Sequence, residues 1–313
     1  MEYISLGKTN LRVSRLALGT AAFGLARYGI CDAEESGAVC EKNAIRLVHA
    51  AIEHGVNFFD TARGYGCSEA VLGNALAGRS SCVVATKVSI PENLSALSSA
   101  ELCNAVMASV DTSLRELKRD VLDVVQIHNA TADTLNRTDL PAILEIARQQ
   151  GKLRYIGASV YGAENALAAL RCGNVEVLQV ALSLLDQRMM SSVLPEARKK
   201  DIGVLARSVF LKGVLTERAK SLPATMHLLA MASDQARETL GDTWESLPRT
   251  GVRFCLSVPG VHSVLLGLRS DAELPAALAA EEAGPLPEPV MRKTESIGLT
   301  DEKMLDPSHW PLL

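Results

Sequence analysis

The stretch GVNFFDTARGYGCSEAVLGNALAGRSSCVVATKV, residues 55–88, contains one complete strand–helix–strand pattern. Its two ends, 55–62 and 82–88, are short runs rich in apolar residues, and SEAVLGNALAG at 68–78 has apolar residues at helical spacing. Because the end runs are apolar nearly throughout and do not alternate with polar residues, they predict parallel strands covered on both faces. The stretch is therefore typical of a βα unit.

The same pattern repeats outward along the chain. Further apolar runs complete a set of eight expected strands, at 15–21, 55–62, 82–88, 122–129, 153–159, 175–183, 202–209 and 262–268. Eight helices are expected at 41–55, 68–78, 100–118 (after a Ser99 N-cap), 140–151, 164–173, 191–201, 247–257 and 270–280. Eight such units in about 250 residues favour an α/β fold of the (β/α)8 TIM-barrel type over an open doubly wound sheet, which usually needs fewer strands.

Three segments lie outside the repeating units. YISLG (3–7) and LRVSR (11–15) flank a Lys-Thr-Asn turn and predict an N-terminal β-hairpin, residues 1–15, that plugs the barrel floor. The segment 210–244 is longer than a simple connection, and the tail from about 284 to 313 has no periodic stripe. Both are candidates for substrate-side loops or surface tails. We expect a single domain spanning residues 1–313.

Composition excludes several classes of protein. The chain is 48% hydrophobic and 22% charged, which excludes general disorder. Its net charge of -4, without blocks of like charge, argues against nucleic-acid and anionic-membrane partners. Without a long apolar stretch or a signal peptide, we expect a cytoplasmic protein with no membrane span. The seven cysteines lack CxxC spacing and are expected to be buried hydrophobes, and no zinc-type motif indicates a metal site.

Four reactive side chains are expected at one mouth of the barrel. The active site of such a barrel is built at the carboxyl ends of its strands. Asp60 ends the second expected strand, Lys87 the third and His128 the fourth, and Tyr65 follows five residues after Asp60. Each residue alone has a structural explanation, as a turn cap, a strand-end lysine, a loop aromatic or a core histidine. Their placement together favours a catalytic site.

The pattern DTARGYGCSEAVLG (60–73), followed by ATKV (85–88) and VVQIHN (124–129), resembles the aldo-keto reductase family. The resemblance covers nearly the whole chain, from LGKTNLRVSRLALGTAAFG (6–24) to VPGVHSVLLGLRSDAEL (258–274). It implies an NAD(P)H-dependent oxidoreductase that acts on a small carbonyl or alcohol substrate, such as an aldehyde, a ketone or a sugar. It also implies that the four residues form the family's catalytic tetrad.

The tetrad has a physical logic of its own. A free tyrosine, with a pKa of about 10, is a weak acid near pH 7, and we expect the Lys87 ammonium to lower the pKa of Tyr65. Asp60 is expected to supply the anion that keeps a buried Lys87 charged. We expect His128 to hydrogen-bond the substrate carbonyl. Tyr65 is then the general acid in reduction and the general base in oxidation.

A hydride must come from a cofactor, because none of these side chains can donate one. No GxGxxG motif follows a strand and no Walker A loop occurs, so no Rossmann site is expected. The resemblance implies instead a nicotinamide cofactor extended across the barrel mouth, with Ser159 and Gln179 at its carboxamide. It further implies Ser208, Leu211 and Gly213 at the pyrophosphate, Gly267, Arg269 and Ser270 at a 2′-phosphate, and Gly19, Thr20 and Glu273 among the other cofactor residues.

Three positions depart from the family pattern and bear on the cofactor. Val160 follows Ser159 where many members have Asn, which removes one carboxamide contact. The Glu273 carboxylate repels a 2′-phosphate, and Ala277 cannot bond the adenine. Arg269, however, offers a bidentate guanidinium to a phosphate. We therefore expect NADPH, with NADH as the alternative.

The substrate pocket is less defined. Phe23, Arg27, Tyr28, Arg63 and Asn129 are candidates to face the reacting carbonyl, and an aromatic content of 4% favours a small or polar substrate. Two other functions stay open. One is a barrel aldolase in which Lys87, free of a strong ion pair, forms a Schiff base. The other is a cofactor-binding regulatory or redox-sensor subunit with negligible turnover.

Overall fold

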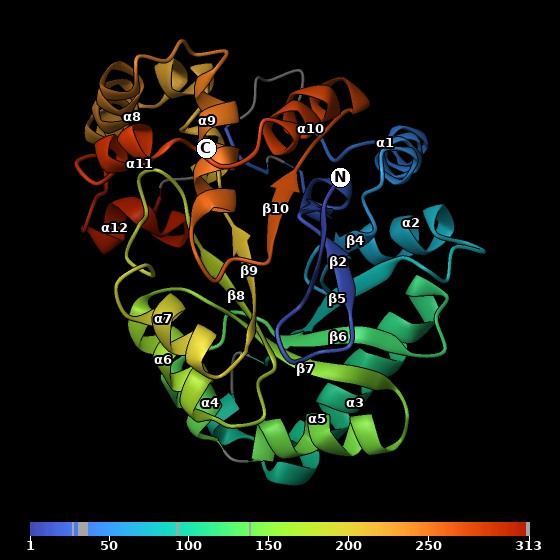
Figure 1. Ribbon diagram of the computed structural model, residues 1–313. Coiled ribbons are helices and arrows are strands. Elements are labelled where there is room, and N and C mark those ends of the chain that lie inside the picture. Colours follow the sequence, from blue (N-terminus) through green and yellow to red (C-terminus); the bar gives the residue numbers. More distant parts are fainter. Residues whose placement is uncertain (27, 31–36, 92–93, 138, 311–313) are drawn as a thin grey trace.

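The computed structural model describes residues 1–26, 28–30, 37–91, 94–137 and 139–310. Within these residues, eight parallel strands close into a barrel in the order β10-β3-β4-β5-β6-β7-β8-β9 (Figure 1). The expected barrel is thus confirmed. Its strands are β3 (Leu16–Gly19), β4 (Phe58–Asp60), β5 (Val83–Val88), β6 (Leu122–Ile127), β7 (Leu153–Val160), β8 (Val177–Ala181), β9 (Gly203–Arg207) and β10 (Ser263–Gly267).

Burial explains why these runs form the barrel wall. All residues of β5 and β6 are buried, as the unbroken apolar pattern predicts for strands covered on both faces. The expected hairpin is also present, as β1 (Tyr3–Ser5) paired antiparallel with β2 (Arg12–Ser14). Leu6, Leu11 and Val13 of this segment pack against residues at the amino ends of the strands, such as Phe58 and Val177. The hairpin therefore fills the barrel floor and leaves the opposite mouth open for a site.

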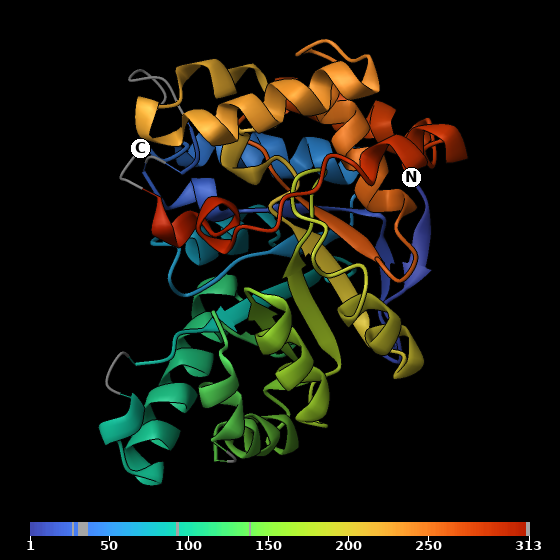
Figure 2. The same cartoon turned by 90° about the vertical axis from the view of Figure 1, so that its left-hand side faces the viewer.

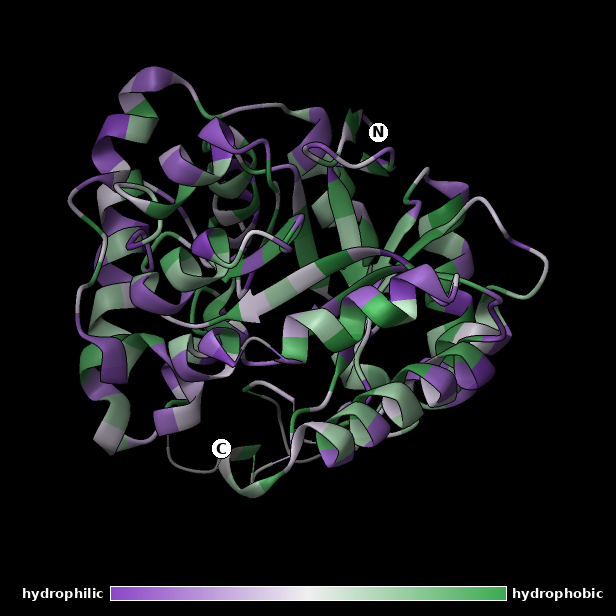
Figure 3. Cartoon of the chain, turned by 90° about the horizontal axis from the view of Figure 1, so that it is seen from below, coloured by the Kyte–Doolittle hydropathy of each residue, from purple (hydrophilic) through white to green (hydrophobic). Residues whose placement is uncertain are grey.

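Helices surround the barrel (Figure 2). They carry hydrophilic residues on much of their surface, whereas the strands are largely hydrophobic (Figure 3). The sequence pattern predicted Ser99 as the N-cap of the third helix. The structure corrects it to Ser98, because the Ser98 hydroxyl accepts the Glu101 amide in a capping box. The surrounding helices are α1 (Glu41–Glu53), α2 (Ser68–Ala75), α3 (Ser99–Leu117), α4 (Ala132–Asn136), α5 (Asp139–Gln149), α6 (Ala163–Arg171), α7 (Val193–Lys199), α9 (Leu247–Ser257) and α10 (Leu274–Glu282).

The long connection and the tail contain more structure than their sequence suggests. The connection contains α8 (His227–Leu240), and the tail contains α11 (Glu288–Thr294) and α12 (Glu302–Leu305). Helices α8 and α11 pack together on one side of the barrel (Figure 1). Leu305 is fully buried, and Pro307 and Ser308 just after it line the cavity at the barrel mouth. Part of the tail is therefore a wall of the site.

The cysteines follow the expectation only in part. Cys82 and Cys255 are buried, whereas Cys40 and Cys67 are exposed, so for these two the prediction of a buried hydrophobe is wrong. The described cysteines are all free thiols. In the described part of the chain, no group of His, Cys, Asp and Glu has a geometry that suits a metal ion. No described helix has both the length and the apolar character needed to cross a membrane.

Candidate active site

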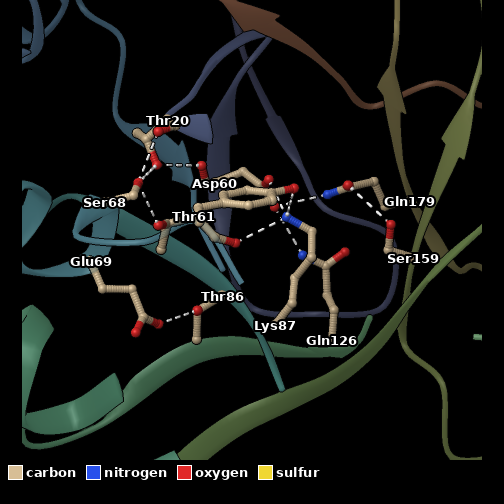
Figure 4. A network of polar contacts seen from close by, with 11 residues as sticks. Thr20, Asp60, Thr61, Ser68, Glu69, Thr86, Lys87, Gln126, Ser159 and Gln179 are labelled. Carbon is tan, nitrogen blue, oxygen red and sulfur yellow. Dashed lines mark hydrogen bonds and ion pairs between the residues drawn. The ribbon is translucent and has the colours of Figure 1, made fainter. Parts of the chain in front are cut away.

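The structure brings the four predicted catalytic residues together at the barrel mouth. Lys87, in β5, is fully buried, and its Nζ lies 2.5 Å from Oδ2 of Asp60 at the end of β4 (Figure 4). The same Nζ lies 3.3 Å from the hydroxyl oxygen of Tyr65, which sits in the loop between β4 and α2. The rings of Tyr65 and His128 meet edge to face, with their centroids 5.7 Å apart. Parallel strands with adjacent carboxyl ends account for this convergence.

Asp60 is the centre of a buried polar network (Figure 4). Its Oδ1 accepts hydrogen bonds from Nε2 of Gln179 at 2.8 Å and Nε2 of Gln126 at 3.0 Å. The Ser159 hydroxyl in turn donates to Gln179 at 3.2 Å. Three side-chain donors, Lys87 included, thus satisfy the carboxylate oxygens of Asp60 inside the barrel. Gln126 was not predicted from the sequence, where its only signal is a polar side chain within a largely apolar strand.

A second network fixes the loop that carries Tyr65. The Ser68 hydroxyl donates to the Thr20 carbonyl at 2.8 Å and lies within hydrogen-bond distance of the hydroxyls of Thr20 and Thr61. The buried Glu69 carboxylate accepts the Thr86 hydroxyl at 2.5 Å. Thr86 precedes Lys87 in β5, so the Tyr65 loop is tied to the strand that carries its lysine.

Three residues of the tetrad, Tyr65, Lys87 and His128, have pKa values that depart from their ordinary values. Burial raises the pKa of Tyr65, the Asp60 carboxylate raises it further, and the charge of Arg207 opposes this only in part. The prediction of a lowered pKa for this tyrosine is therefore wrong, and it is a protonated phenol near pH 7. Burial, together with the charges of Lys87 and Arg207, lowers the pKa of His128 to about 3, so its imidazole is neutral.

A cavity of about 710 Å³ opens at this mouth. It is lined by Asp60, Tyr65 and His128 and by two of the expected substrate residues, Tyr28 and Asn129. Arg27, another expected substrate residue, lies outside the described residues. Of the expected cofactor residues, those that line the cavity are Gly19, Thr20, Ser159, Gln179, Ser208, Gly213, Gly267, Arg269 and Glu273.

Besides Lys87, which is fully buried behind the lining, four expected substrate and cofactor residues do not line this cavity. Phe23 is 1% exposed and packs in the apolar core, so its expected contact with substrate is wrong. Arg63 is drawn away by Glu69 and Glu116, whose carboxylates lie 2.5 and 2.7 Å from its Nη1. Two expected cofactor residues are also outside the lining. They are Leu211, which is fully buried, and Ser270.

The loop after β9 has a strained backbone that suits phosphate groups. Ser208, Leu211 and Lys212 have φ of 60°, 45° and 53°, in the left-handed region, and Gly213 follows at 103°, where only glycine is at ease. Each strained non-glycine residue costs about 1–3 kcal/mol, and such residues cluster at ligand sites. Left-handed turns of this kind build the amide nests that hold anions. The cavity here is also lined by cations, namely Lys212, Arg218, Arg249 and Arg269.

Comparison with known proteins identifies the family. The model of the Aldo/keto reductase family matches residues 15–298. The chain belongs to this family. It is therefore an oxidoreductase of a family that uses nicotinamide cofactors, and the expectation of an NAD(P)H-dependent enzyme is confirmed.

Individual proteins of known sequence or structure are also similar to this chain. The chain is 26% identical over 299 residues to aldo-keto reductase YhdN of Bacillus subtilis (strain 168), covering 88% of this chain and 87% of that one. It is 30% identical over 239 residues to the NADH-specific methylglyoxal reductase of Escherichia coli (strain K12), covering 69% of each. The holo form of aldo-keto reductase AKR11C1 from Bacillus halodurans matches in structure with a TM-score of 0.77, at 25% identity over 99% of both chains.

Arg207 is a charged cavity residue of this aldo/keto reductase that was not predicted from the sequence. Arg207 ends β9, and its guanidinium carbon lies 3.8 Å from the ring centroid of Tyr161. It donates to the Val160 carbonyl at 3.0 Å and to the Ser208 hydroxyl at 3.2 Å, while its Nε is buried without a hydrogen-bond partner. The strand-end rule that selected Asp60 and Lys87 also applies to this arginine, and would have found it.

Proposed function

We propose that this enzyme transfers a hydride between a nicotinamide dinucleotide and the carbonyl of a small aldehyde, ketone or sugar, or the corresponding alcohol. The observation that carries the proposal is the meeting of Lys87 Nζ, the Tyr65 hydroxyl and the His128 ring at one cavity. The bound nicotinamide supplies the hydride in reduction and accepts it in oxidation. The protein contributes the proton, the orientation and the charges.

Tyr65 is the proposed general acid. Its raised pKa keeps the phenol protonated until a carbonyl oxygen arrives to take the proton. The ammonium of Lys87, 3.3 Å away, then stabilises the phenolate that remains. Burial lowers the pKa of Lys87, and the ion pair with Asp60 opposes this effect by favouring the charged form. In the reverse direction Tyr65 takes the proton from the alcohol.

His128 is proposed to orient the substrate. Its imidazole is neutral near pH 7, because its pKa is about 3, and so it offers one N–H donor to the carbonyl oxygen without adding a charge. The ring lies edge to face with Tyr65, so both groups address the same side of the cavity. Two donors on one oxygen hold the carbonyl carbon in place for hydride transfer.

The cavity lining fits an extended dinucleotide. Ser159 and Gln179, joined by a hydrogen bond beside Asp60, are proposed to hold the carboxamide. The strained loop at Ser208 and Gly213 is proposed to hold the pyrophosphate. Arg269, which also lines the cavity, is the proposed ligand of a 2′-phosphate, which favours NADPH.

The choice between NADPH and NADH has a direct test. Glu273 lines the same cavity, and the relative from Escherichia coli is, by its name, NADH-specific. Dissociation constants of both reduced cofactors are measured for the wild type and for Arg269→Gln. We expect tighter binding of NADPH that is lost in the variant. Equal affinities in the wild type would remove the case for Arg269 as a phosphate ligand.

The geometry of the site bears differently on the two alternative functions, the barrel aldolase and the redox-sensor subunit. A Schiff-base aldolase needs a free lysine, yet Lys87 is fully buried and paired with Asp60 at 2.5 Å. That arrangement argues against an aldolase. A redox-sensor subunit would keep this geometry without turnover, so only a rate measurement distinguishes it. We propose that residues 1–313 form one catalytic domain, and the cytoplasmic location stays a prediction.

The test is oxidation of NADPH or NADH with a panel of aldehydes, ketones and sugars, and the reverse reaction with alcohols. We expect Tyr65→Phe to lower kcat by about 10²–10⁴-fold while cofactor affinity is kept. Tyr155→Phe is the matched control, because it removes a hydroxyl that accepts the Asn10 amide at the barrel floor. Wild-type turnover in a folded Tyr65→Phe would refute the assignment. Tight cofactor binding without turnover on any substrate would favour the sensor.

A further inference from the structure

The reacting end of the cavity has an unbalanced positive charge. Lys87 and Asp60 offset one another in their ion pair. Arg207 has no such partner, because no carboxylate of the described residues forms an ion pair with it, and the groups that act most on its charge are tyrosines. A guanidinium that is partly enclosed and unpaired with an anion is uncommon, since it has lost water without gaining a counter-ion.

The position of this guanidinium is fixed. Its plane is held over the Tyr161 ring at 3.8 Å, and its two terminal nitrogens donate to Val160 and Ser208. These contacts anchor it to the end of β7 on one side and to the loop after β9 on the other. Arg207 therefore cannot turn its charge out to solvent without breaking two hydrogen bonds and a cation–π contact.

The charge of Arg207 reaches the reactive groups. It acts on the pKa values of Tyr65, His128 and Lys87, in each case disfavouring further positive charge. Strand register agrees, because Arg207 pairs with Ala181, two residues after Gln179 in β8. Val160, which accepts one of its hydrogen bonds, directly follows Ser159. The guanidinium thus lies beside the residues proposed to hold the carboxamide.

Hydride transfer requires the nicotinamide ring to lie near the positive charge of Arg207. The reacting atoms must approach to about 3–3.5 Å, so a ring that reduces a carbonyl bound at Tyr65 has to occupy the same end of the cavity. In the overall reaction, carbonyl, NADPH and one proton give alcohol and NADP⁺. The ring is uncharged in the reduced cofactor and is a cation in the oxidised one. A fixed positive charge near the ring therefore repels the ring of the oxidised form and not that of the reduced form.

We infer that Arg207 makes the cavity select the reduced nicotinamide cofactor over the oxidised one, and so suits this enzyme to carbonyl reduction. The inference rests on the proposed function. The overall equilibrium of the reaction is unaffected, since a catalyst does not alter it. What changes is binding: the reduced cofactor saturates the enzyme at lower concentration, and the oxidised product dissociates more readily.

The test compares the dissociation constants of NADPH and NADP⁺, measured by isothermal titration calorimetry at one ionic strength. Both ligands carry the same phosphates and adenosine, so their ratio isolates the charge of the ring. We expect the wild type to bind NADPH at least about tenfold more tightly, and Arg207→Gln to lower that ratio by about tenfold. Arg207→Lys keeps a cation at this position and should keep most of the preference.

Arg269→Gln is the matched control, because it removes a cavity cation proposed to face the 2′-phosphate that both forms share. We expect it to weaken both forms equally and to leave the ratio unchanged. An unchanged ratio in a folded Arg207→Gln that binds both forms would overturn the inference and leave the proposed function intact. An unchanged ratio with a raised KM for carboxylate-bearing substrates alone would overturn it in favour of a substrate contact. Failure of the wild type to bind NADPH, NADP⁺, NADH or NAD⁺ would refute the proposed function as well.

Discussion

The buried ion pair between Lys87 and Asp60 predicts that variants lacking one of the two charges are less stable than a variant lacking both. The lysine is 0% exposed, the aspartate is 4% exposed, and their charged atoms are 2.5 Å apart. Removing one partner of such a pair leaves a buried charge without a counter-ion, which costs about 3–5 kcal/mol. We expect that loss from Asp60→Asn and from Lys87→Met, each measured as a change in the free energy of unfolding.

The double variant should lose less stability than either single variant. With both charges gone, nothing is left to desolvate, and replacement of a whole buried pair by uncharged groups is often neutral or stabilising. An asparagine at position 60 also keeps an oxygen that accepts from Gln126 and Gln179, which now bond Oδ1 of the aspartate. The recovery therefore depends on removing the second charge rather than on rebuilding a contact.

Urea denaturation followed by circular dichroism at pH 7 measures the three stabilities, and turnover is measured alongside. All three variants should lose most of their activity, so activity and stability separate in the double variant. Arg292→Ala is the control, because its partner Glu288 and Arg292 itself are both about three-quarters exposed and the loss should stay below about 1 kcal/mol. A double variant destabilised by the sum of the single losses would refute a coupled buried pair.

Two further predictions concern His128 and Gly24. Because the pKa of His128 is about 3 in the folded state against an ordinary 6.5, the unfolded chain binds the proton first, and this part of the stability is lost as pH falls from 6.5 toward 3. From pH 7 to pH 5 the loss should be about 2 kcal/mol in urea denaturation; an equal decline in His128→Asn would contradict it. A Cβ on Gly24 would lie 1.8 Å from the Tyr65 carbonyl oxygen, so Gly24→Ala must displace the loop that carries the general acid. We expect kcat to fall about tenfold or more. Gly37→Ala is the control and should leave kcat unchanged, because a Cβ on Gly37 meets no atom of the described residues within 4 Å. Equal rates in the two variants would show that the loop tolerates the shift.

The fold and the meeting of the tetrad could be predicted from the sequence because they depend on local pattern. Apolar runs of strand length and helical periodicity are properties of neighbouring residues. In a closed barrel of parallel strands, the carboxyl ends of all strands lie at the same mouth. Asp60, Lys87 and His128 each end such a run. The proximity of these three side chains could therefore be predicted without knowing how the other side chains pack. The same rule covers Arg207, which was overlooked although it ends its strand in the same way.

Side-chain direction and charge environment were decided only by the tertiary structure. Phe23 ends a short 3-10 helix (Ala21–Phe23) and Arg63 lies in the loop after β4. Phe23 is buried in the core and Arg63 is held by two carboxylates, because contacts that form only in the folded chain fix the direction of each side chain. The pKa of Tyr65 rises where a neighbouring lysine alone suggested a fall. Desolvation and the field of Asp60 depend on every atom around the phenol, and those atoms come together only when the barrel closes.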